Sequence, residues 1–490
     1  MKYDHLTLLT DFYELTMMQG YHVTGLSDKK VVFDLFYRAN PLGNGYAICA
    51  GLEQAIDYVK NLQFSDEDIA YLRSLHMLSD EFIDYLKTFR FTGDIYAIPE
   101  GTVVFPGEPL MRISAPIVEA QLMETALLNI INHQSLIATK AARVVWAAAG
   151  DGVLEFGVRR AQGPDAGIYG ARAAIIAGCA ATSNVLTGQM FDVPVRGTHA
   201  HSWVMSFDDE LTAFRTYAKI FPNACILLVD TYDTIQSGVP NAIAVFREMR
   251  EAGIPLKNYG IRLDSGDFAY LPKIARKMLD EAGFPDAMIS ASNDLDEMLI
   301  QSLKQQGTKI TLWGVGTRMI TSHDCPSFGG VYKLAAEEDA DGQMCPKIKL
   351  SENAEKVTNP GVKKVFRLYD AKTDKIKADL IALDHETIDE SKPLTIFDPQ
   401  ATWKRMTLKA GDYRVRELLV PVFLKGECVY ESPKVMDIRA YCKTELDSLW
   451  DEHKRLMNPH TLPVDLSQEL YDLKQKMIHD IRHPAQNGAS

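Results

Sequence analysis

The amino-acid sequence predicts an α/β protein whose central part is an irregular α/β barrel. Between residues 151 and 335, short apolar segments alternate with helical ones, which is typical of parallel strands joined by right-handed crossovers. These apolar segments are continuous rather than alternating, as expected for strands that are buried on both faces of a sheet. The chain has 490 residues, which is long enough for two or three domains.

The N-terminal part, residues 1–150, is predicted to be an α+β domain. Residues 6–23 place apolar side chains on one broad helical face, and residues 31–38 form a β-rich run. Residues 92–117 contain short apolar runs divided by proline and glycine, which predicts a small sheet with tight turns. A long helix is expected over residues 119–149.

The barrel itself is predicted over residues 151–335. Its strands are expected at residues 153–156, 193–197, 225–230, 259–264, 287–292 and 309–316. Helical segments fall between them. No G-x-G-x-x-G motif follows the first strand, so a dinucleotide-binding sheet is not supported. A closed or nearly closed barrel therefore fits better than an open sheet.

The C-terminal region, residues 336–490, is expected to pack on the N-terminal domain, which it completes, and on the barrel. It opens with the polar stretch EEDADGQ, and residues 363–384 predict a hairpin. Residues 435–457 and 465–482 predict surface helices.

Composition limits the class of function. The net charge of -13 argues against nucleic acid as a partner, because an acidic chain repels phosphate backbones. The seven cysteines show no C-x-x-C spacing, so neither a disulfide framework nor a zinc site is predicted. The N-terminus lacks the apolar core of a signal peptide, and no apolar run is long enough to span a membrane. We therefore expect a cytoplasmic protein without a membrane partner.

Polar and charged residues follow the predicted barrel strands. In α/β barrels the active site lies at the C-terminal ends of the strands. The segments found there are FGVRR (156–160), GTHAHS (197–202), DTYD (230–233), RLDSGD (262–267) and GVGTR (314–318). This agreement predicts one site at the barrel mouth.

Each segment suggests a chemistry. Arg262 can form a fork with a carboxylate or phosphate, and Asp264 can accept the hydroxyls of a ribose diol. Asp267 is expected only to cap the next helix. Arg159 and Arg160 at the mouth indicate an anion site.

Glycine and histidine residues complete this set. Gly314 and Gly316 allow a phosphate to approach backbone N–H groups closely, although an ordinary turn is the alternative. His199 and His201 could bind metal, act as a base or carry a phosphate, or could simply be a pair of surface histidines. Together the segments predict a ligand with a phosphate, a ribose and a carboxylate.

Seven segments in this order resemble the nicotinate phosphoribosyltransferase family. They are LLTDFYELTM, FGVRRAQGPD, GTHAHS, LVDTYD, GIRLDSGD, GVGTRM and FGGVYKL, and the resemblance covers roughly residues 5–370. It implies a type II phosphoribosyltransferase-like fold. It also implies that nicotinate, phosphoribosyl pyrophosphate, ATP and water are converted to nicotinate mononucleotide, pyrophosphate, ADP and phosphate, the first step of NAD synthesis from nicotinate.

The resemblance also implies roles for individual residues. The catalytic residues are His201, which ATP phosphorylates, and Asp264, which contacts the ribose. The substrate-binding residues are Tyr13, Thr198 and Arg262 for nicotinate, Thr317, Gly314 and Gly316 for the phosphoribosyl substrate, Phe156 for stacking on the ring and Arg159 for phosphate.

ATP as co-substrate and Mg²⁺ follow from the same resemblance, and no protein ligands of the metal are assigned. In relatives the base pocket is completed across a dimer interface, so a homodimer with shared sites is expected, Tyr13 coming from the second subunit. Three alternatives stay open: a nicotinamide- or quinolinate-using relative, a barrel aldolase or isomerase, and a non-enzymatic nucleotide-binding protein. The aldolase would need a lysine at a strand end, and the strand ends named above carry none.

Overall fold

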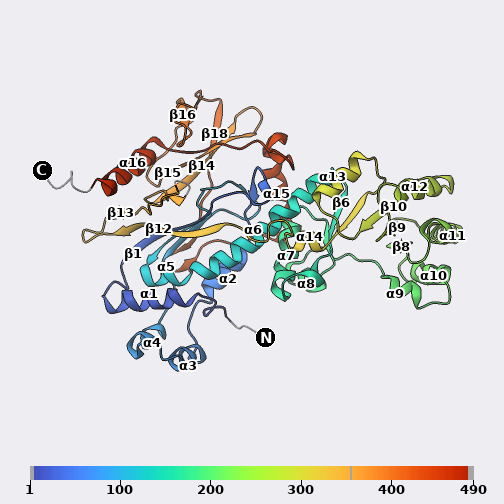
Figure 1. The fold of residues 1–490 in the computed structure, drawn as a ribbon, viewed down its shortest axis with the longest axis horizontal. Coiled ribbons are helices and arrows are strands. Elements are labelled where there is room, and N and C mark those ends of the chain that lie inside the picture. Colours follow the sequence, from blue (N-terminus) through green and yellow to red (C-terminus); the bar gives the residue numbers. More distant parts are fainter. Residues whose placement is uncertain (1–4, 354–355, 484–490) are drawn as a thin grey trace. The chain divides into compact units, whose positions relative to one another are not determined.

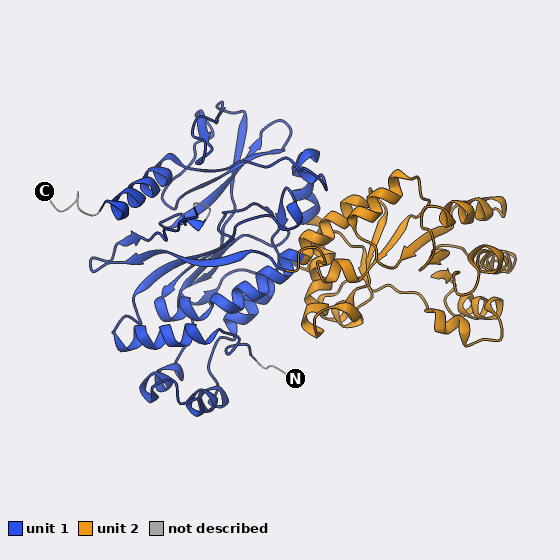
Figure 2. Ribbon diagram, viewed as in Figure 1, with its two compact units in different colours: residues 1–136, 327–433, 441–490 blue, residues 137–326, 434–440 orange. Residues whose placement is uncertain are grey.

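The computed structural model describes residues 5–353 and 356–483 (Figure 1). The chain forms two compact units, each assembled from separate stretches of sequence (Figure 2). Unit 1 contains residues 1–136, 327–433 and 441–490, and unit 2 contains residues 137–326 and 434–440.

Unit 1 is built on an antiparallel sheet with the strand order β13-β12-β1-β5-β3-β19-β20. The strands are β1 (Lys30–Tyr37), β3 (Asp94–Ala97), β5 (Met111–Pro116), β12 (Gly330–Glu338), β13 (Met344–Pro346), β19 (Val420–Leu424) and β20 (Glu427–Cys428). The sheet thus combines N-terminal strands with strands from beyond residue 327. This confirms that later chain completes the N-terminal domain.

The predicted N-terminal elements are present, with shifted ends. Helix α1 (Phe12–Val23) begins six residues later than the apolar pattern indicated, after Asp11 in extended conformation. The long helix predicted over residues 119–149 is divided into α5 (Ile117–Leu122) and α6 (Glu124–Ala147). The small sheet expected within residues 92–117 is supplied by β3, β5 and the short β4 (Val103–Val104).

The C-terminal chain adds a four-stranded sheet to unit 1, in the order β18-β14-β15-β21. The hairpin predicted over residues 363–384 is confirmed as β14 (Lys363–Asp370) and β15 (Ile376–Leu383). The other two strands are β18 (Tyr413–Glu417) and β21 (Val464–Leu466). The predicted surface helices are α15 (Val435–Ser448) and α16 (Gln468–Arg482).

Unit 2 contains a six-stranded parallel sheet in the order β7-β6-β11-β10-β9-β8. The strands are β6 (Gly152–Glu155), β7 (Ala181–Thr182), β8 (Cys225–Leu228), β9 (Tyr259–Leu263), β10 (Met288–Ser292) and β11 (Leu312–Val315). The helices between them are α7 (Pro164–Ile176), α8 (Val185–Phe191), α9 (His201–Met205), α10 (Glu210–Ile220), α11 (Val239–Glu251), α12 (Leu271–Glu281) and α13 (Glu297–Gln305). This parallel half-barrel confirms the predicted fold class.

One predicted strand, residues 193–197, is wrong. The second strand is instead β7, and Val195 forms only an isolated bridge with Thr182. Pro194 has no N–H group to donate to a ladder, which confines it to the edge of a sheet. The segment therefore lies along the free edge of β7, where Thr182 N–H donates to the Pro194 carbonyl over 3.0 Å.

The hydrogen-bonded sheet is open, with β7 and β8 at its two edges. The segment that leaves the β7 edge reaches β8 through His199, whose Nε2 accepts a hydrogen bond from Leu228 N–H over 3.3 Å. The His199 side chain thus connects this segment to β8, where no backbone pairing between strands does so.

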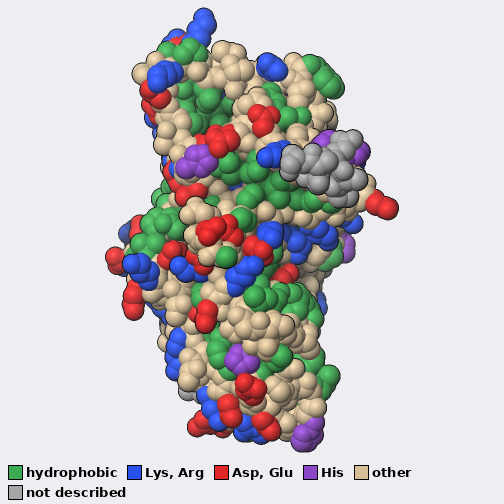
Figure 3. Space-filling view, turned by 90° about the vertical axis from the view of Figure 1, so that its left-hand side faces the viewer, with side chains coloured by type: hydrophobic (Ala, Val, Ile, Leu, Met, Phe, Trp, Pro, Cys, Tyr) green, Lys and Arg blue, Asp and Glu red, His purple; other side chains and the backbone are tan. Residues whose placement is uncertain are grey.

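On the molecular face shown in Figure 3, basic side chains are interspersed with acidic ones. No helix within the described residues is long and apolar enough to cross a membrane.

Candidate active site

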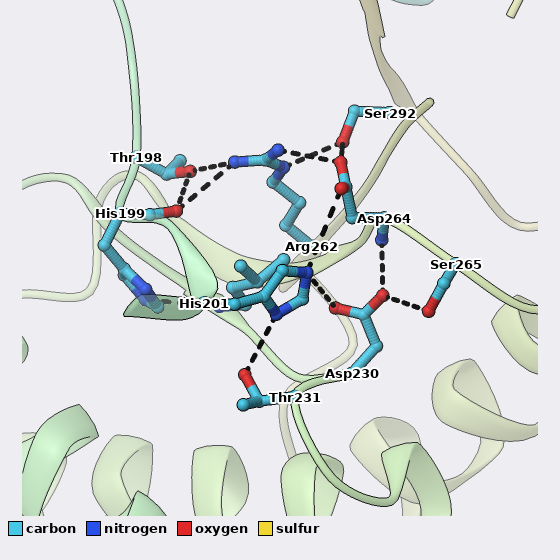
Figure 4. Close-up of polar contacts among 10 residues, drawn as sticks. Thr198, His199, His201, Asp230, Thr231, Arg262, Asp264, Ser265 and Ser292 are labelled. Carbon is cyan, nitrogen blue, oxygen red and sulfur yellow. Dashed lines mark hydrogen bonds and ion pairs between the residues drawn. The ribbon is translucent and has the colours of Figure 1, made fainter. Parts of the chain in front are cut away.

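The polar residues that follow β8, β9 and β10 form one hydrogen-bonded cluster in unit 2 (Figure 4). Arg262, on β9, lies at its centre. Its Nε donates to Ser292 Oγ over 2.9 Å, and its Nη1 donates to Thr198 Oγ1 over 2.8 Å. Its Nη2 donates to Asp264 Oδ1 over 2.8 Å. The structure therefore brings three of the predicted site residues, Thr198, Arg262 and Asp264, into direct contact.

Asp264 carries a stabilised negative charge. Burial opposes its ionisation, but the hydrogen bond from Ser292 and the charge of Arg262 outweigh burial and lower the pKa of Asp264. We conclude that this carboxylate is ionised over the ordinary pH range, as expected for a group that contacts a ribose or a cation.

Asp230 holds the loop that carries Asp264. Its Oδ2 accepts hydrogen bonds from Asp264 N–H over 2.9 Å and from Ser265 Oγ over 2.6 Å. Its side chain is 2% exposed, and its Oδ1 is buried without a hydrogen-bond partner among the described residues. A buried carboxylate oxygen without a donor is costly, which indicates a ligand site.

His201 begins α9 and faces both carboxylates. Its Nδ1 lies 3.1 Å from Thr231 Oγ1, and its Nε2 lies 3.9 Å from one oxygen of Asp230 and of Asp264. The side chain is 38% exposed, so a substrate can reach the ring.

The two neighbouring histidines differ sharply, which excludes the interpretation of a surface pair. His199 is only 8% exposed and packs edge-on against Tyr217. Burial lowers the pKa of His199 to about 4, so this ring is neutral and structural. Of the pair, only His201 has the exposure that a phosphate-carrying residue needs.

Phe156 follows β6 and lies beside Arg262, whose Cζ is 6.0 Å from the centre of the ring. A Cβ atom at Gly314 would lie 2.7 Å from Cδ2 and Cε2 of Phe156. A Cβ atom at Gly316 would lie 3.0 Å from the Phe156 carbonyl oxygen. Both glycines are therefore needed for close packing against Phe156, and their predicted role in phosphate binding remains a prediction.

The other predicted residues lie around or outside this cluster. Thr317 is the first residue of α14 (Thr317–Ile320), and its neighbour Arg318 donates to Asp296 over 2.5 Å. Arg159 is exposed and follows β6. The expectation that Asp267 caps the next helix is wrong, because α12 (Leu271–Glu281) has Tyr270 as its N-cap and no side-chain cap hydrogen bond. Asp267 Oδ1 instead accepts hydrogen bonds from Ala269 N–H and Tyr270 N–H in the turn before the helix.

Tyr13 belongs to unit 1. It lies on α1 and is 45% exposed. Burial and the nearby Glu124 carboxylate raise the pKa of the Tyr13 phenol, which is therefore neutral. Its predicted contact with nicotinate remains a prediction.

The sequence analysis placed Asp230, Thr231 and Ser265 at the barrel mouth without giving them a role, and it missed Ser292. The available signal was positional, since Asp230 and Ser292 each stand at or just beyond the C-terminal end of a buried strand. Polar side chains at such positions of neighbouring parallel strands meet at one edge of the sheet.

The cluster combines a guanidinium, two carboxylates, an exposed imidazole and an aromatic ring. A guanidinium next to an aromatic ring fits a flat anionic ring. Two carboxylates facing an imidazole fit a site that binds a cation or transfers a phosphoryl group.

Comparison with known proteins shows the family to which the chain is similar. Family models for the nicotinate phosphoribosyltransferase (NAPRTase) N-terminal domain, the NAPRTase family and the nicotinate phosphoribosyltransferase C-terminal domain match residues 8–132, 152–335 and 362–474. The nicotinate phosphoribosyltransferase of Bacillus subtilis (strain 168) is 48% identical over 98% of this chain and 97% of its own length.

Two solved structures are also similar. The crystal structure of human nicotinic acid phosphoribosyltransferase has a TM-score of 0.82 and 30% identity, covering 96% of this chain and all of that one (100%). The nicotinate-nucleotide pyrophosphorylase of Pyrococcus furiosus has a TM-score of 0.69 at 22% identity, covering 91% of this chain and 97% of that one. This second likeness concerns the fold alone.

Proposed function

The chain belongs to the nicotinate phosphoribosyltransferase family, and we propose that it joins nicotinate to the phosphoribosyl group of phosphoribosyl pyrophosphate. ATP is the co-substrate, and the products are nicotinate mononucleotide, pyrophosphate, ADP and phosphate. The observation that carries this proposal is the Arg262 cluster at the strand ends, in which an exposed His201 faces two carboxylates.

Arg262, Thr198 and Phe156 are the proposed base pocket. A guanidinium has five N–H donors, and the contacts with Ser292, Thr198 and Asp264 leave at least one on Nη2. That donor and the Thr198 hydroxyl can hold the nicotinate carboxylate while its ring stacks on Phe156. Nicotinamide has no carboxylate, so this pocket favours the acid.

In the transfer step, the bond between ribose C1 and the pyrophosphate oxygen breaks, and a bond between C1 and the pyridine nitrogen forms. Positive charge develops on the ribose as pyrophosphate leaves. The ionised Asp264 carboxylate is placed to accept hydrogen bonds from the ribose hydroxyls and to stabilise that charge.

His201 is the proposed phosphate carrier. A ring nitrogen takes the terminal phosphoryl group of ATP, ADP leaves, and water later releases phosphate. Thr231 fixes the orientation of the ring through Nδ1. A phosphorylated ring adds negative charge beside the reacting ribose, which couples ATP use to the transfer.

Magnesium fits this site. Mg²⁺ prefers oxygen ligands and is often bound by one or two carboxylates together with substrate phosphates. Asp230 and Asp264 would supply the carboxylates, since Oδ1 of Asp230 has no hydrogen-bond partner among the described residues. The ion would neutralise charge on the pyrophosphate.

The decisive assay supplies nicotinate, phosphoribosyl pyrophosphate and Mg²⁺, with and without ATP, and measures the mononucleotide by chromatography. We expect product formation that ATP strongly stimulates. Parallel reactions with nicotinamide and quinolinate should give little product. Turnover of either rival base in preference to nicotinate, or no turnover at all, would contradict the proposal.

We also propose a homodimer in which Tyr13 completes the base pocket of the second subunit. Tyr13→Ala and His201→Ala should each be nearly inactive. Mixed and allowed to exchange subunits, they form hybrids with one intact site, so activity should recover to about a quarter of wild type if mixing is random. A mixture that stays inactive despite proven exchange would show that Tyr13 serves its own chain. The cytoplasmic location stays a prediction.

A further inference from the structure

Glu155 is a buried carboxylate of unit 2 that the proposed reaction does not use. It is the last residue of β6, is 0% exposed, and immediately precedes Phe156, the proposed stacking partner of the base. One of its carboxylate oxygens accepts a hydrogen bond from Gly157 N–H, and the other accepts one from Thr182 Oγ1 over 2.6 Å. Both donors are neutral groups, so neither hydrogen bond brings a positive charge to the carboxylate.

A glutamate at this position costs the fold free energy. Glutamate is almost never fully buried in proteins unless it is paired, because burial removes the charge from water. Burial accordingly raises the pKa of Glu155, and the hydrogen bonds from Thr182 and Gly157 only partly oppose that effect. The benefit that offsets this cost lies in the two segments of chain that the carboxylate holds.

The first segment is the turn that carries Phe156. Phe156 N–H donates to the Val315 carbonyl over 2.8 Å, which ties this residue to β11. The next N–H group along the chain, that of Gly157, is the one that Glu155 accepts. A Cβ atom at Gly157 would lie 2.8 Å from Glu155 Oε1 and 2.5 Å from Ile320 Cβ, so only glycine fits this turn. The backbone on both sides of the Phe156 side chain is therefore fixed, which sets the direction of the ring.

The second segment leads to Thr198. Thr182, whose hydroxyl donates to Glu155, lies on the edge strand β7. Its N–H group donates to the Pro194 carbonyl over 3.0 Å, and its carbonyl accepts from Arg196 N–H over 2.9 Å. Thr198 follows directly in this segment. The position of Thr198 therefore depends on Thr182, and through Thr182 on Glu155.

We propose that Glu155 is a positioning residue for the base pocket. One carboxylate oxygen holds the turn of Phe156, and the other holds the Thr198 segment through Thr182. Because Glu155 is fully buried, it acts through these residues and does not touch the substrate. The inference rests on the proposed function, which makes Phe156 and Thr198 walls of the pocket. A preorganised pocket lowers the cost of binding, so loss of either hydrogen bond should weaken binding of the base.

The test is steady-state kinetics of the full-length protein, with nicotinate varied at saturating phosphoribosyl pyrophosphate and ATP. Glu155→Gln offers one acceptor oxygen to two donors, so KM for nicotinate should rise about five- to ten-fold while kcat stays within about two-fold of wild type. Thr182→Val removes the donor hydroxyl and should have the same effect. Thr182→Ser keeps the hydroxyl and should have a KM close to that of wild type.

The matched control is Glu119→Gln in unit 1. Glu119 is 7% exposed and also accepts hydrogen bonds from a backbone N–H and a threonine hydroxyl, both of Thr92, over 2.6 and 2.8 Å. Neither hydrogen bond involves the base pocket. Glu119→Gln should keep KM for nicotinate at the wild-type value even if its melting temperature falls, because loss of folded enzyme lowers kcat and leaves KM unchanged.

A higher KM in Glu155→Gln and Thr182→Val, but not in Thr182→Ser, supports the inference. An unchanged KM in Thr182→Val, or an equal rise in Glu119→Gln, would overturn it. The two Thr182 variants decide the question alone if Glu155→Gln does not fold. If wild type uses nicotinamide or quinolinate instead of nicotinate, KM for that base gives the same comparison. No turnover of any base by wild type would overturn the proposed function and this inference together, whereas an unchanged KM in the variants overturns this inference alone.

Discussion

Two clusters in this protein combine an arginine with carboxylates, and they differ in exposure and in pairing. In unit 2, Arg262 and Asp264 are 15% and 30% exposed and are joined by a single hydrogen bond of 2.8 Å. In unit 1, Arg367 and Asp379 are both 0% exposed. Two parallel hydrogen bonds of 2.9 and 2.6 Å join them, and Glu445 accepts a third from Arg367 over 3.0 Å.

The difference separates binding chemistry from structural chemistry. The Arg367 cluster has no room for a ligand, because each carboxylate is buried and paired within the fold. The Arg262 cluster keeps an unused guanidinium N–H, a partly exposed imidazole and an Asp230 oxygen that has no hydrogen-bond partner in the described part of the chain. Residue type is the same in both places, and only exposure and completeness of pairing distinguish them.

The largest expected effect is on phosphoryl transfer at the exposed cluster. His201→Ala should remove the acid-labile, base-stable label that labelled ATP leaves on the protein, and ATP hydrolysis should fall at least about a hundred-fold. Its melting temperature should stay near that of wild type, because the ring is 38% exposed.

Two histidine variants serve as controls. His479→Ala removes an exposed ring from α16 and should change neither label nor stability. His199→Ala should keep the label but melt earlier, because Leu228 N–H loses its acceptor. A label that survives His201→Ala would show that another residue carries the phosphate.

The next effect concerns stability at the buried cluster. Arg367→Ala leaves Asp379 and Glu445 buried without their cation, and we expect a loss of about 3–5 kcal/mol in the free energy of unfolding. Urea denaturation followed by circular dichroism measures it. Arg414→Ala breaks an exposed pair with Asp374 in the same region and should cost less than about 1 kcal/mol. Equal losses in the free energy of unfolding for the two variants would show that the buried Arg367 cluster is no more important for stability than an exposed ion pair.

A smaller effect on free energy is expected for the catalytic arginine. Arg262→Ala should lower kcat/KM for nicotinate by about one to two powers of ten, since a hydrogen bond to a charged group contributes about 1.5–3 kcal/mol. Arg262→Lys should not restore it fully, because lysine cannot make a planar two-pronged contact. Steady-state kinetics with varied nicotinate measure both. Unchanged kinetics in the two variants are incompatible with the proposed contact.

The smallest effect tests a carboxylate that has no cation. Glu14 is buried and accepts hydrogen bonds from Thr125 over 2.6 and 3.1 Å. Burial raises its pKa from 4.5 to about 7. The folded state therefore holds a proton that the unfolded state has released, so this contribution to stability falls as the pH rises from about 4.5 to 7.

Glu14→Gln should flatten the dependence of melting temperature on pH over this range, by roughly 1–3 °C. Scanning calorimetry at several pH values measures it. If wild type and variant show parallel pH profiles, Glu14 is ionised in the folded protein.

Much of the fold follows from local sequence pattern. The continuous apolar runs at residues 225–230, 259–264, 287–292 and 309–316 became β8, β9, β10 and β11 because any strand buried on both faces must be apolar throughout. The strand predicted at residues 193–197 did not form, because Pro194 has no N–H group to donate to a ladder and the segment lies on an edge. Whether the missing N–H group of a proline prevents strand formation depends on which strands lie beside it.

At the site, too, some features follow from local sequence and others depend on the tertiary structure. The sequence by itself determined which polar side chains stand at strand ends, since the order of apolar and polar residues along the chain is a local property. Only the tertiary structure decided that His199 is buried against Tyr217 while His201 is exposed, and that Asp230 holds the loop of Asp264. Burial and hydrogen-bond partners come from residues distant in sequence, and the pKa and the accessibility of a side chain depend on those partners rather than on its type.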